Sequence, residues 1–179
     1  MAVDPSREFK PINIALLTVS DTRAPVNDSS GDILAERIGK AGHRLAARAI
    51  EKDDANLISG RLNNWIDDPN VDAVVITGGT GLTGRDVTPE ALERVKQAGG
   101  GRDIPGFGEL FRMISYKTIG TSTVQSRACA VVARGTYIFA LPGSNGAVKD
   151  GWDGILAEQL DSRNDPCNFV ELMPRLREV

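Results

Sequence analysis

The sequence is short of the side chains that most metal centres and covalent catalysts use. It contains one histidine, His43, and two cysteines, Cys129 and Cys167, with no CxxC or Cys/His grouping. Zinc sites and Cys/His nucleophiles need such groupings, so both are poor interpretations of this chain. Cys129 lies in the apolar run ACAVVA, where a buried and inert thiol is expected, and the role of Cys167 stays open.

Long apolar runs and an excess of one charge are also absent. No segment approaches the roughly 18 apolar residues of a membrane span, and the opening MAVDPSREFKP lacks the apolar core of a signal peptide. The 21 basic residues are scattered among 24 acidic ones, for a net charge of -3, whereas nucleic-acid binding favours a basic patch. We therefore expect a cytosolic protein with no membrane and no nucleic acid among its partners.

What is present is the composition of an ordinary globular protein. Hydrophobic residues make up 41% and charged residues 25% of the chain, which are typical values. A single unit of 179 residues can bury roughly 70% of its unfolded surface. We predict one domain over residues 1–179, with a core from about 12 to 161 between a polar N-terminal lead and a C-terminal extension.

The first half of the sequence alternates between strand and helix patterns. Apolar runs of strand length and apolar residues at helical spacing follow one another. The strands are predicted at 12–20, 44–50 and 71–77, and the helices at 32–42 and 55–65. A third helix begins near Thr88, the expected N-cap, with Pro89 in its first turn. Units of this kind form a parallel sheet with covering helices.

The middle of the sequence breaks the alternation. Residues 99–108 are rich in glycine, and a helix is predicted at 109–116, with its end marked by Gly120. After this segment the pattern of strand and helix no longer repeats.

Two closely spaced strand patterns follow, at 128–133 and 136–141. Only Arg134 and Gly135 separate them, which is too short for a crossover helix, so we expect a hairpin. A last helix is predicted at 147–160. The fold class is therefore α/β, a single three-layer α/β/α domain with a mixed, mostly parallel sheet.

Several single residues have expected local roles. Ser29 or Ser30 is expected to cap the first helix, and Asp53 or Asp54 the second. His43 follows a glycine at a helix end, where a solvent-facing or capping role is expected.

The stretch VVITGGTGLTGRDVTPE, residues 74–90, fits two nucleotide-loop patterns and obeys neither. Gly79, Gly81 and Gly84 satisfy G-x-G-x-x-G, but the predicted helix begins four or more residues after Gly84, whereas the glycines of a dinucleotide-binding unit open the helix directly. A Walker loop needs lysine and then serine or threonine, and Arg85 and Asp86 stand there instead. We therefore set aside both a nicotinamide-dependent oxidoreductase and a P-loop enzyme.

Backbone amides freed by these glycines can hold an oxyanion. A carboxylate shortly after them, Asp86, then holds a divalent cation that bridges to the anion. The alternative is a plain tight turn in which Asp86 favours the start of the following helix. Four glycines within seven residues favour anion binding.

Four stretches together carry a resemblance to a known family: VITGGTGLTGRDVTPEAL, GFGELFRMIS, TSTVQSRACA and LPGSNGAVKDGW. The chain closely resembles the MoaB/MogA family of molybdenum cofactor biosynthesis, and the gephyrin and plant Cnx1 G domains look similar as well. The resemblance implies a molybdopterin-binding domain that assembles as a trimer or hexamer. Its active members transfer AMP from Mg-ATP to the terminal phosphate of molybdopterin.

The resemblance also implies roles for particular residues. Asp86 matches the catalytic aspartate after the GGTG loop, and Asp53 the second acidic residue, with Asp54 as the alternative. Both carboxylates would hold Mg²⁺. The positions that match the molybdopterin and phosphate site are Ser20, Thr77, Gly78, Gly79, Thr80, Gly81, Ser126, Gly143 and Ser144.

Some alternatives remain open. Ser20 can serve as a turn former at a strand end, and Ser126 and Ser144 as helix caps. Gly84 stands where many active relatives carry proline. The expected activity is adenylylation of molybdopterin, the alternative is a non-catalytic carrier of molybdopterin, and a metal-insertion protein is a possible partner.

Overall fold

The fold is built around one six-stranded sheet in a computed structural model that describes residues 3–178. The strand order is β2-β1-β3-β6-β5-β4, with β2, β1, β3 and β6 parallel and β5 and β4 each antiparallel to its neighbour. The strands are β1 (Asn13–Val19), β2 (Arg44–Glu51), β3 (Ala73–Thr77), β4 (Arg102–Asp103), β5 (Cys129–Ala133) and β6 (Thr136–Leu141). The mixed, mostly parallel sheet and the β5-β6 hairpin are confirmed.

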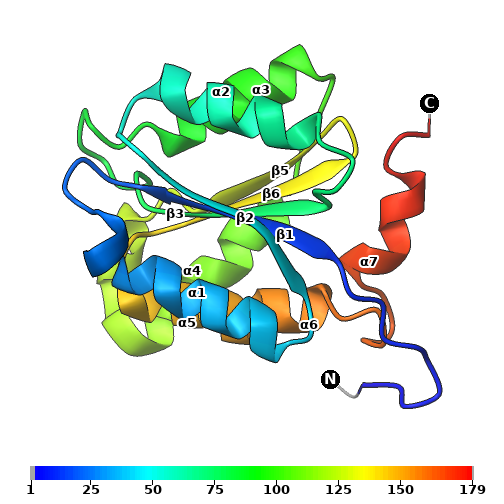
Figure 1. The fold of residues 1–179 in the computed structure, drawn as a ribbon. Helices are drawn as coiled ribbons and strands as arrows, with labels where there is room; N and C mark the ends of the chain where they lie inside the picture. The colour runs from blue at the N-terminus through cyan, green and yellow to red at the C-terminus, as the bar shows by residue number, and fades with distance from the viewer. Residues whose placement is uncertain (1–2, 179) are drawn as a thin grey trace.

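Helices cover both faces of this sheet (Figure 1). One layer holds α2 (Ala55–Ile66) and α3 (Thr88–Ala98), and the other holds α1 (Ser29–Lys40), α4 (Pro105–Ile119), α5 (Asn145–Gly151) and α6 (Ala157–Gln159). Short helical turns lie at Pro25–Asn27, Gly120–Gln125 and Met173–Arg175, and α7 (Phe169–Leu172) lies beside the sheet. The three-layer α/β/α class is therefore confirmed.

The hydrophobic core is divided by the sheet into two clusters. Along β1, Ile14 and Leu16 face the α1 side, whereas Ala15 and Leu17 face the α2 side. This is the period-2 alternation of a strand buried on both faces. The C-terminal extension also contributes, because Val170 of α7 belongs to the α1-side cluster.

The start of α1 differs from the prediction. The helix begins at Ser29, and its cap is Asp28, whose side chain accepts a hydrogen bond of 3.1 Å from the Gly31 amide. Neither Ser29 nor Ser30 caps it. Asp28 is fully buried, because it also receives bonds from side chains of two strands, so its capping role follows from tertiary contacts.

The start of α3 follows the expected position but not the expected cap. The helix begins at Thr88, four positions after Gly84, as expected. However, the Thr88 hydroxyl donates to the carbonyl of Gly78 at 2.9 Å instead of capping the helix. Thr88 therefore fastens the glycine loop to α3.

Two later elements are longer or less regular than predicted. α4 begins at Pro105, within the glycine-rich segment, and ends at Ile119, where the φ of 58° at the following Gly120 stops the helix as expected. The last helix runs on from α5 into α6 through a π-helical turn at Trp152–Leu156. The short strand β4 within the glycine-rich segment was not predicted.

His43 is buried, so the solvent-facing prediction is wrong, whereas its amide does take part in the cap of α1 by donating to the Ile38 carbonyl at 3.1 Å. Only 6% of the residue is exposed, its ring lies 5.2 Å from that of Phe9, and its Nδ1 accepts from the Ile12 amide at 3.4 Å. The residues that cover it come from the N-terminal lead, far from it in sequence. Cys129 is half-buried, and burial raises the pKa of its thiol to about 11, as an inert thiol requires.

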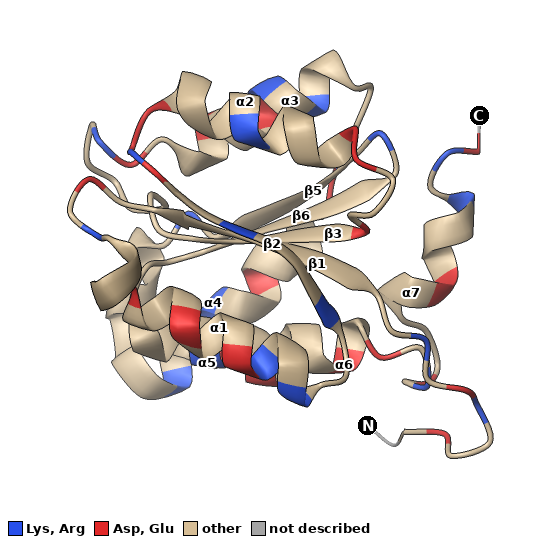
Figure 2. Cartoon of the chain, viewed as in Figure 1, with Lys and Arg blue, Asp and Glu red and all other residues tan. Residues whose placement is uncertain are grey.

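Charges lie on the helical layers, on the loops and on the edge strand β2, with both signs mixed (Figure 2). Along α1, Asp32 stands in the first turn and Arg37 and Lys40 in the last, which suits the helix dipole. Within residues 3–178, no helix is long and apolar enough to cross a membrane.

Candidate functional site

The carboxyl ends of the parallel strands β1, β3 and β6 meet at one end of the sheet, where α/β proteins bind ligands. A cavity of about 330 Å³ opens there. Its lining joins segments that are far apart in sequence. The lining residues are Thr18, Val19, Ser20, Arg23, Ser30, Asp53, Thr77, Gly78, Gly79, Thr80, Gly81, Asp86, Pro142 and Gly143. Nine of the eleven predicted site residues therefore line one cavity, while Ser126 and Ser144 do not.

The turn after β3 lines this cavity, and it requires glycine. Gly78 and Gly79 have φ values of 108° and 65°, in the region that favours glycine. A Cβ on Gly78 would lie 2.1 Å from the carbonyl oxygen of Val19. Within residues 3–178, the amides of Gly79 and Thr80 have no hydrogen-bond acceptor, so both N–H groups are available to an oxyanion.

Two carboxylates approach this turn closely. A Cβ on Gly79 would lie 3.1 Å from Asp53 Oδ1, and one on Gly81 would lie 2.7 Å from Asp86 Oδ2. Asp86 acts on Asp53 through its charge. The glycines therefore leave room for two acidic side chains on the edge of the cavity, and we call Asp53, Asp86 and the neighbouring Asp21 the acidic rim.

Asp86 is held ready as an ionised carboxylate. Its Oδ2 accepts hydrogen bonds from the amide of Thr83 at 2.9 Å and from the Thr83 hydroxyl at 2.7 Å. Burial alone would raise the pKa of Asp86, but these bonds and one from the Gly81 amide outweigh it and lower the pKa.

The pKa of Asp53 is shifted in the opposite direction from that of Asp86. Burial, and then the negative charges of Asp21 and Asp86, raise the pKa of Asp53 above its usual range. Asp21 is partly neutralised by Arg85, whose Nε donates to it at 3.0 Å. The neighbouring Asp54 instead caps α2, accepting from the amides of its first turn. The geometry thus places Asp53, and not Asp54, in the cavity.

Arg127 clamps the loop that carries Asp86. Its Nε donates to the carbonyl of Gly81 at 2.7 Å, its Nη2 to the carbonyl of Asp86 at 2.6 Å, and its guanidinium pairs with Glu90. Its own amide donates to the carbonyl of Thr80 at 2.9 Å. Sequence reasoning missed Arg127, although it directly follows Ser126 in the stretch TSTVQSRACA.

A buried polar network lies under the other side of the cavity. Asp28 accepts from Thr18 at 2.7 Å and from Arg48 at 2.8 Å, and Arg23 lies 3.3 Å away. Burial would raise the pKa of Asp28, but the bonds from Arg48, Thr18 and the Gly31 amide lower it. We call Asp28, Arg48, Arg23 and Thr18 the anchored floor. The glycine at position 31 is the one sequence feature near Asp28 that indicates this network, because a Cβ there would lie 2.0 Å from Asp28 Oδ2.

Ser126 and Ser144 line a second, more apolar hollow of about 200 Å³ beside the first. The two hollows share Thr80, Gly81 and Pro142, so together they form one continuous candidate site. The other residues that line the second hollow are Phe111, Ser115, Ile119, Ser122, Gln125 and Ala147.

The serines keep their local roles as well. Ser20 Oγ accepts from the amides of Thr22 and Arg23, each at 3.2 Å, as a turn former does. Ser144 caps α5 by accepting from the Ala147 amide at 3.2 Å. Ser126 Oγ accepts from the Ala128 amide at 3.2 Å, and the Ser126 amide caps the helical turn Gly120–Gln125 by donating to the Thr123 carbonyl at 3.0 Å. A local role and a place in the site are thus compatible for all three.

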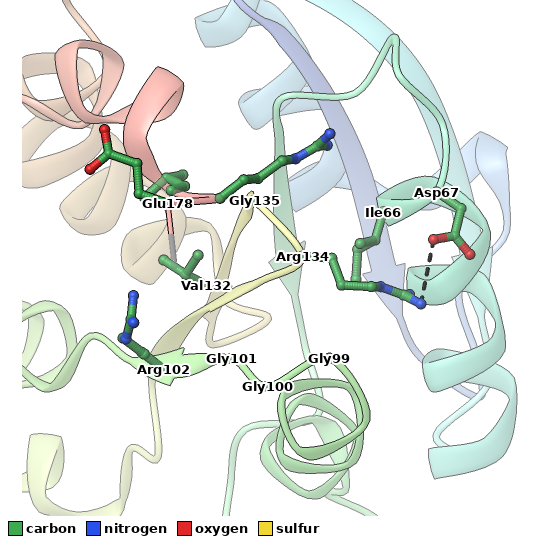
Figure 3. A pocket seen from close by; sticks show the side chains of 12 residues that line it. Ile66, Asp67, Gly99, Gly100, Gly101, Arg102, Val132, Arg134, Gly135 and Glu178 are labelled. Carbon is green, nitrogen blue, oxygen red and sulfur yellow. Dashed lines mark ion pairs between the residues drawn. The ribbon is translucent and has the colours of Figure 1, made fainter.

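A larger cavity, of about 590 Å³, lies at the opposite end of the sheet (Figure 3). Arg102 and Arg134 stand at opposite ends of its glycine run Gly99–Gly101, and Arg134 turns away to pair with Asp67 at 3.4 Å. It contains none of the predicted site residues. The ends of α2 and α3 that border it are carboxyl ends, which favour cations over phosphate.

Within residues 3–178, no group of three or more His, Cys, Asp and Glu side chains is arranged to hold a metal ion.

The comparison with known families agrees with this geometry. The family described as "Probable molybdopterin binding domain" matches residues 15–162, which include both hollows. The chain belongs to this molybdopterin-binding family. Molybdenum cofactor biosynthesis protein B of Escherichia coli K12 is 48% identical over 164 residues, which cover 92% of this chain and 94% of that protein.

Solved structures of the molybdopterin-binding family share the fold. A crystal structure of molybdenum cofactor biosynthesis protein B has a TM-score of 0.83 at 35% identity, over 95% of this chain and 98% of the other. The tungsten cofactor synthesizing protein MoaB from Pyrococcus furiosus has a TM-score of 0.76 at 33% identity, over 94% and 99%. The resemblance to the MoaB/MogA family is thereby confirmed, and the chain is a protein of molybdenum cofactor biosynthesis.

Proposed function

We propose that this protein is a molybdopterin adenylyltransferase, which transfers AMP from Mg-ATP to the terminal phosphate of molybdopterin and releases pyrophosphate. The observation that carries the proposal is the placement of Asp53 and Asp86 across a glycine turn whose Gly79 and Thr80 amides have no acceptor within residues 3–178. Amides and acidic groups on one edge suit a phosphate that arrives with a cation.

The donor set fits Mg²⁺. This ion is usually held by one or two carboxylates, with substrate phosphates and waters completing its shell. Burial is the first cause of the raised pKa of Asp53, and the negative charges of Asp21 and Asp86 add to it; a divalent cation would relieve this repulsion. Asp53 and Asp86 would hold the ion, and bound there it would neutralise charge on the triphosphate.

In the proposed reaction a terminal phosphate oxygen of molybdopterin forms a bond to the α-phosphorus of ATP. The bond from that phosphorus to the oxygen bridging to the β-phosphorus breaks, and pyrophosphate leaves with the electron pair. The protein's part is positioning and neutralisation of charge. The Gly79 and Thr80 amides would stabilise phosphate oxygens, and Ser126 and Ser144 of the second hollow would orient the pterin.

The proposal includes a homo-oligomer, a trimer or a hexamer. Apolar side chains are exposed on α4 and the helical turn after it, and an isolated monomer rarely exposes such a patch without a use for it. They are Leu110, Met113, Tyr116, Ile119 and Val124. Ile119 also lines the second hollow, so a neighbouring copy on this patch would lie beside the site. We also place the reaction in the cytosol, with a metal-insertion protein as a candidate partner.

The alternative is a carrier that holds molybdopterin without catalysis. The test supplies purified protein with molybdopterin, ATP and Mg²⁺ and detects adenylylated molybdopterin by mass. We expect product from the wild type and a fall of about 10²- to 10³-fold or more in Asp86→Asn, with molybdopterin binding unchanged within a few-fold. Tight molybdopterin binding without product from either protein would instead establish the carrier.

A further inference from the structure

We propose that Arg23 is a phosphate-binding residue of the candidate site and holds the polyphosphate of the nucleotide. This inference rests on the proposed function, because it assumes that a nucleotide enters the first hollow. None of the motifs that carry the family resemblance contains Arg23. The residue follows β1 in a loop that sequence reasoning left without a role.

Arg23 is the single basic side chain among the described residues that line the first hollow. Asp53 and Asp86 are the acidic ones. The hollow thus carries one guanidinium in addition to its two carboxylates. A polyphosphate with a bound cation has both signs of charge to match, since its metal takes the carboxylates and its oxygens take the guanidinium.

The Arg23 side chain is fixed before any ligand arrives. Its Nη1 donates to Asp28 Oδ1 at 3.3 Å and to Ser30 Oγ at 2.5 Å, and its Nη2 donates to the carbonyl of Gly143 at 3.0 Å. Only 25% of the side chain is exposed, and that of Asp28 is fully buried. Contacts from α1 and from the turn after β6 therefore set the direction of the guanidinium, and little side-chain entropy is left to lose on binding.

These contacts leave part of the guanidinium unused. Of the five N–H groups of an arginine, the Nε–H and one on Nη2 have no acceptor within residues 3–178. Nε and Nη2 form the edge of arginine that can hold a phosphate by two parallel bonds.

The test measures binding alone, by calorimetric titration of ATP, pyrophosphate and adenosine in the presence of Mg²⁺ and without molybdopterin. For Arg23→Gln we expect affinity for ATP and pyrophosphate to fall about 10- to 100-fold, the range for loss of a charged hydrogen-bonding partner. Arg23→Lys keeps the charge but not the two-pronged bond, so we expect an intermediate loss. Adenosine affinity is expected to stay unchanged.

Arg44→Gln is the matched control, because it removes one positive charge from an exposed side chain that has no hydrogen bond or ion pair within residues 3–178. Thermal unfolding shows which variants are folded. Equal affinity of folded Arg23→Gln and wild type for pyrophosphate, or no binding of ATP and pyrophosphate by the wild type, would overturn the inference. Wild-type binding that depends on Arg23, without adenylylated product, would uphold the inference and refute the proposed activity.

Discussion

The two sides of the candidate cavity shift the pKa of a carboxyl group in opposite directions. In the anchored floor, Asp28 is fully buried, yet hydrogen bonds hold its pKa below the usual value. In the acidic rim, Asp53 is only half-buried, yet its pKa is raised, first by burial and then by the negative charges of Asp21 and Asp86. Burial raises the pKa of both carboxyl groups, and the partners decide whether that rise is reversed, as at Asp28, or increased, as at Asp53. The partners of the anchored floor all come from this chain, whereas the acidic rim would gain from a cation bound with a ligand.

We expect substitutions in the anchored floor to lower the free energy of unfolding much more than substitutions in the acidic rim. Asp28→Asn removes a buried charge that binds Thr18, Arg48 and the Gly31 amide, so we expect the free energy of unfolding to fall by about 3 kcal/mol. Asp53→Asn relieves repulsion, so we expect a change below about 1 kcal/mol, in the stabilising direction. Urea unfolding of both variants measures the difference.

Asp54→Ala is the control for the second variant. It removes the α2 cap, which we expect to lower the free energy of unfolding by about 1 kcal/mol while leaving AMP transfer intact. Asp53→Asn should leave the free energy of unfolding unchanged or slightly higher, but it should impair AMP transfer. If Asp28→Asn and Asp53→Asn destabilised the protein equally, the contrast between floor and rim would be wrong.

The next effect concerns Arg127, which holds the rim in place. Arg127→Ala removes the bonds to the carbonyls of Gly81 and Asp86, and we expect kcat/KM for AMP transfer to fall about 10- to 100-fold. Because Asp86 would be less well placed, a higher Mg²⁺ concentration should be needed for half-maximal rate.

A purely structural role for Arg127 would lower the unfolding midpoint without moving this Mg²⁺ requirement. Steady-state rates over a Mg²⁺ series therefore decide between the two roles. Arg127→Lys, which keeps the charge, is the matched variant.

How much of this could be predicted from sequence differs between the two sides. Periodicity located the main strands and helices, and the glycines of residues 78–81 together with Asp86 pointed to a loop for an anion and a cation. The pairing of Asp53 with Asp86 came from the family resemblance, because the two residues lie on different loops. The structure adds that Asp54 is occupied as a helix cap.

The anchored floor could not be predicted, because its contacts join distant segments. Arg23 meets the carbonyl of Gly143, 120 positions away, and no periodicity encodes such a contact. His43 was misjudged for the same reason, since the N-terminal lead that covers it carries no helix or strand pattern of its own. Local patterns set the elements, but long-range packing sets which polar side chains become buried.

His43 offers a third case, a buried group away from the cavity. Burial lowers its pKa although Asp161 acts in the other direction, so the fold favours neutral imidazole. Its stabilising effect is therefore complete above the unfolded pKa of about 6.5 and is lost as pH falls below it. We expect the free energy of unfolding to decrease between pH 7 and 5, by at most about 1.4 kcal/mol per pH unit from this residue.

Urea unfolding of wild type and His43→Gln at several pH values checks this. The glutamine can accept from the Ile12 amide as Nδ1 does, but it does not titrate. The variant should show a smaller loss between pH 7 and 5. An identical pH dependence would mean that His43 does not titrate in this range.

The smallest effect tests whether Gly84 loosens the rim. A Cβ added to Gly84 meets no atom within 4 Å, and the residue is not among those with positive φ. Gly84→Ala should therefore raise the free energy of unfolding by about 0.5 kcal/mol, by restricting the unfolded chain, and leave AMP transfer unchanged within about twofold. A loss of activity above tenfold would show that the freedom of this position is used.

We propose that the acidic rim is completed by a cation that arrives with the nucleotide. The most direct measurement is calorimetric titration of ATP into wild type and into the double variant Asp53→Asn/Asp86→Asn, each with Mg²⁺ and with EDTA. We predict that the wild type binds ATP more tightly with Mg²⁺ than with EDTA, and that the double variant shows no such difference. Equal wild-type affinity under both conditions would contradict the claim.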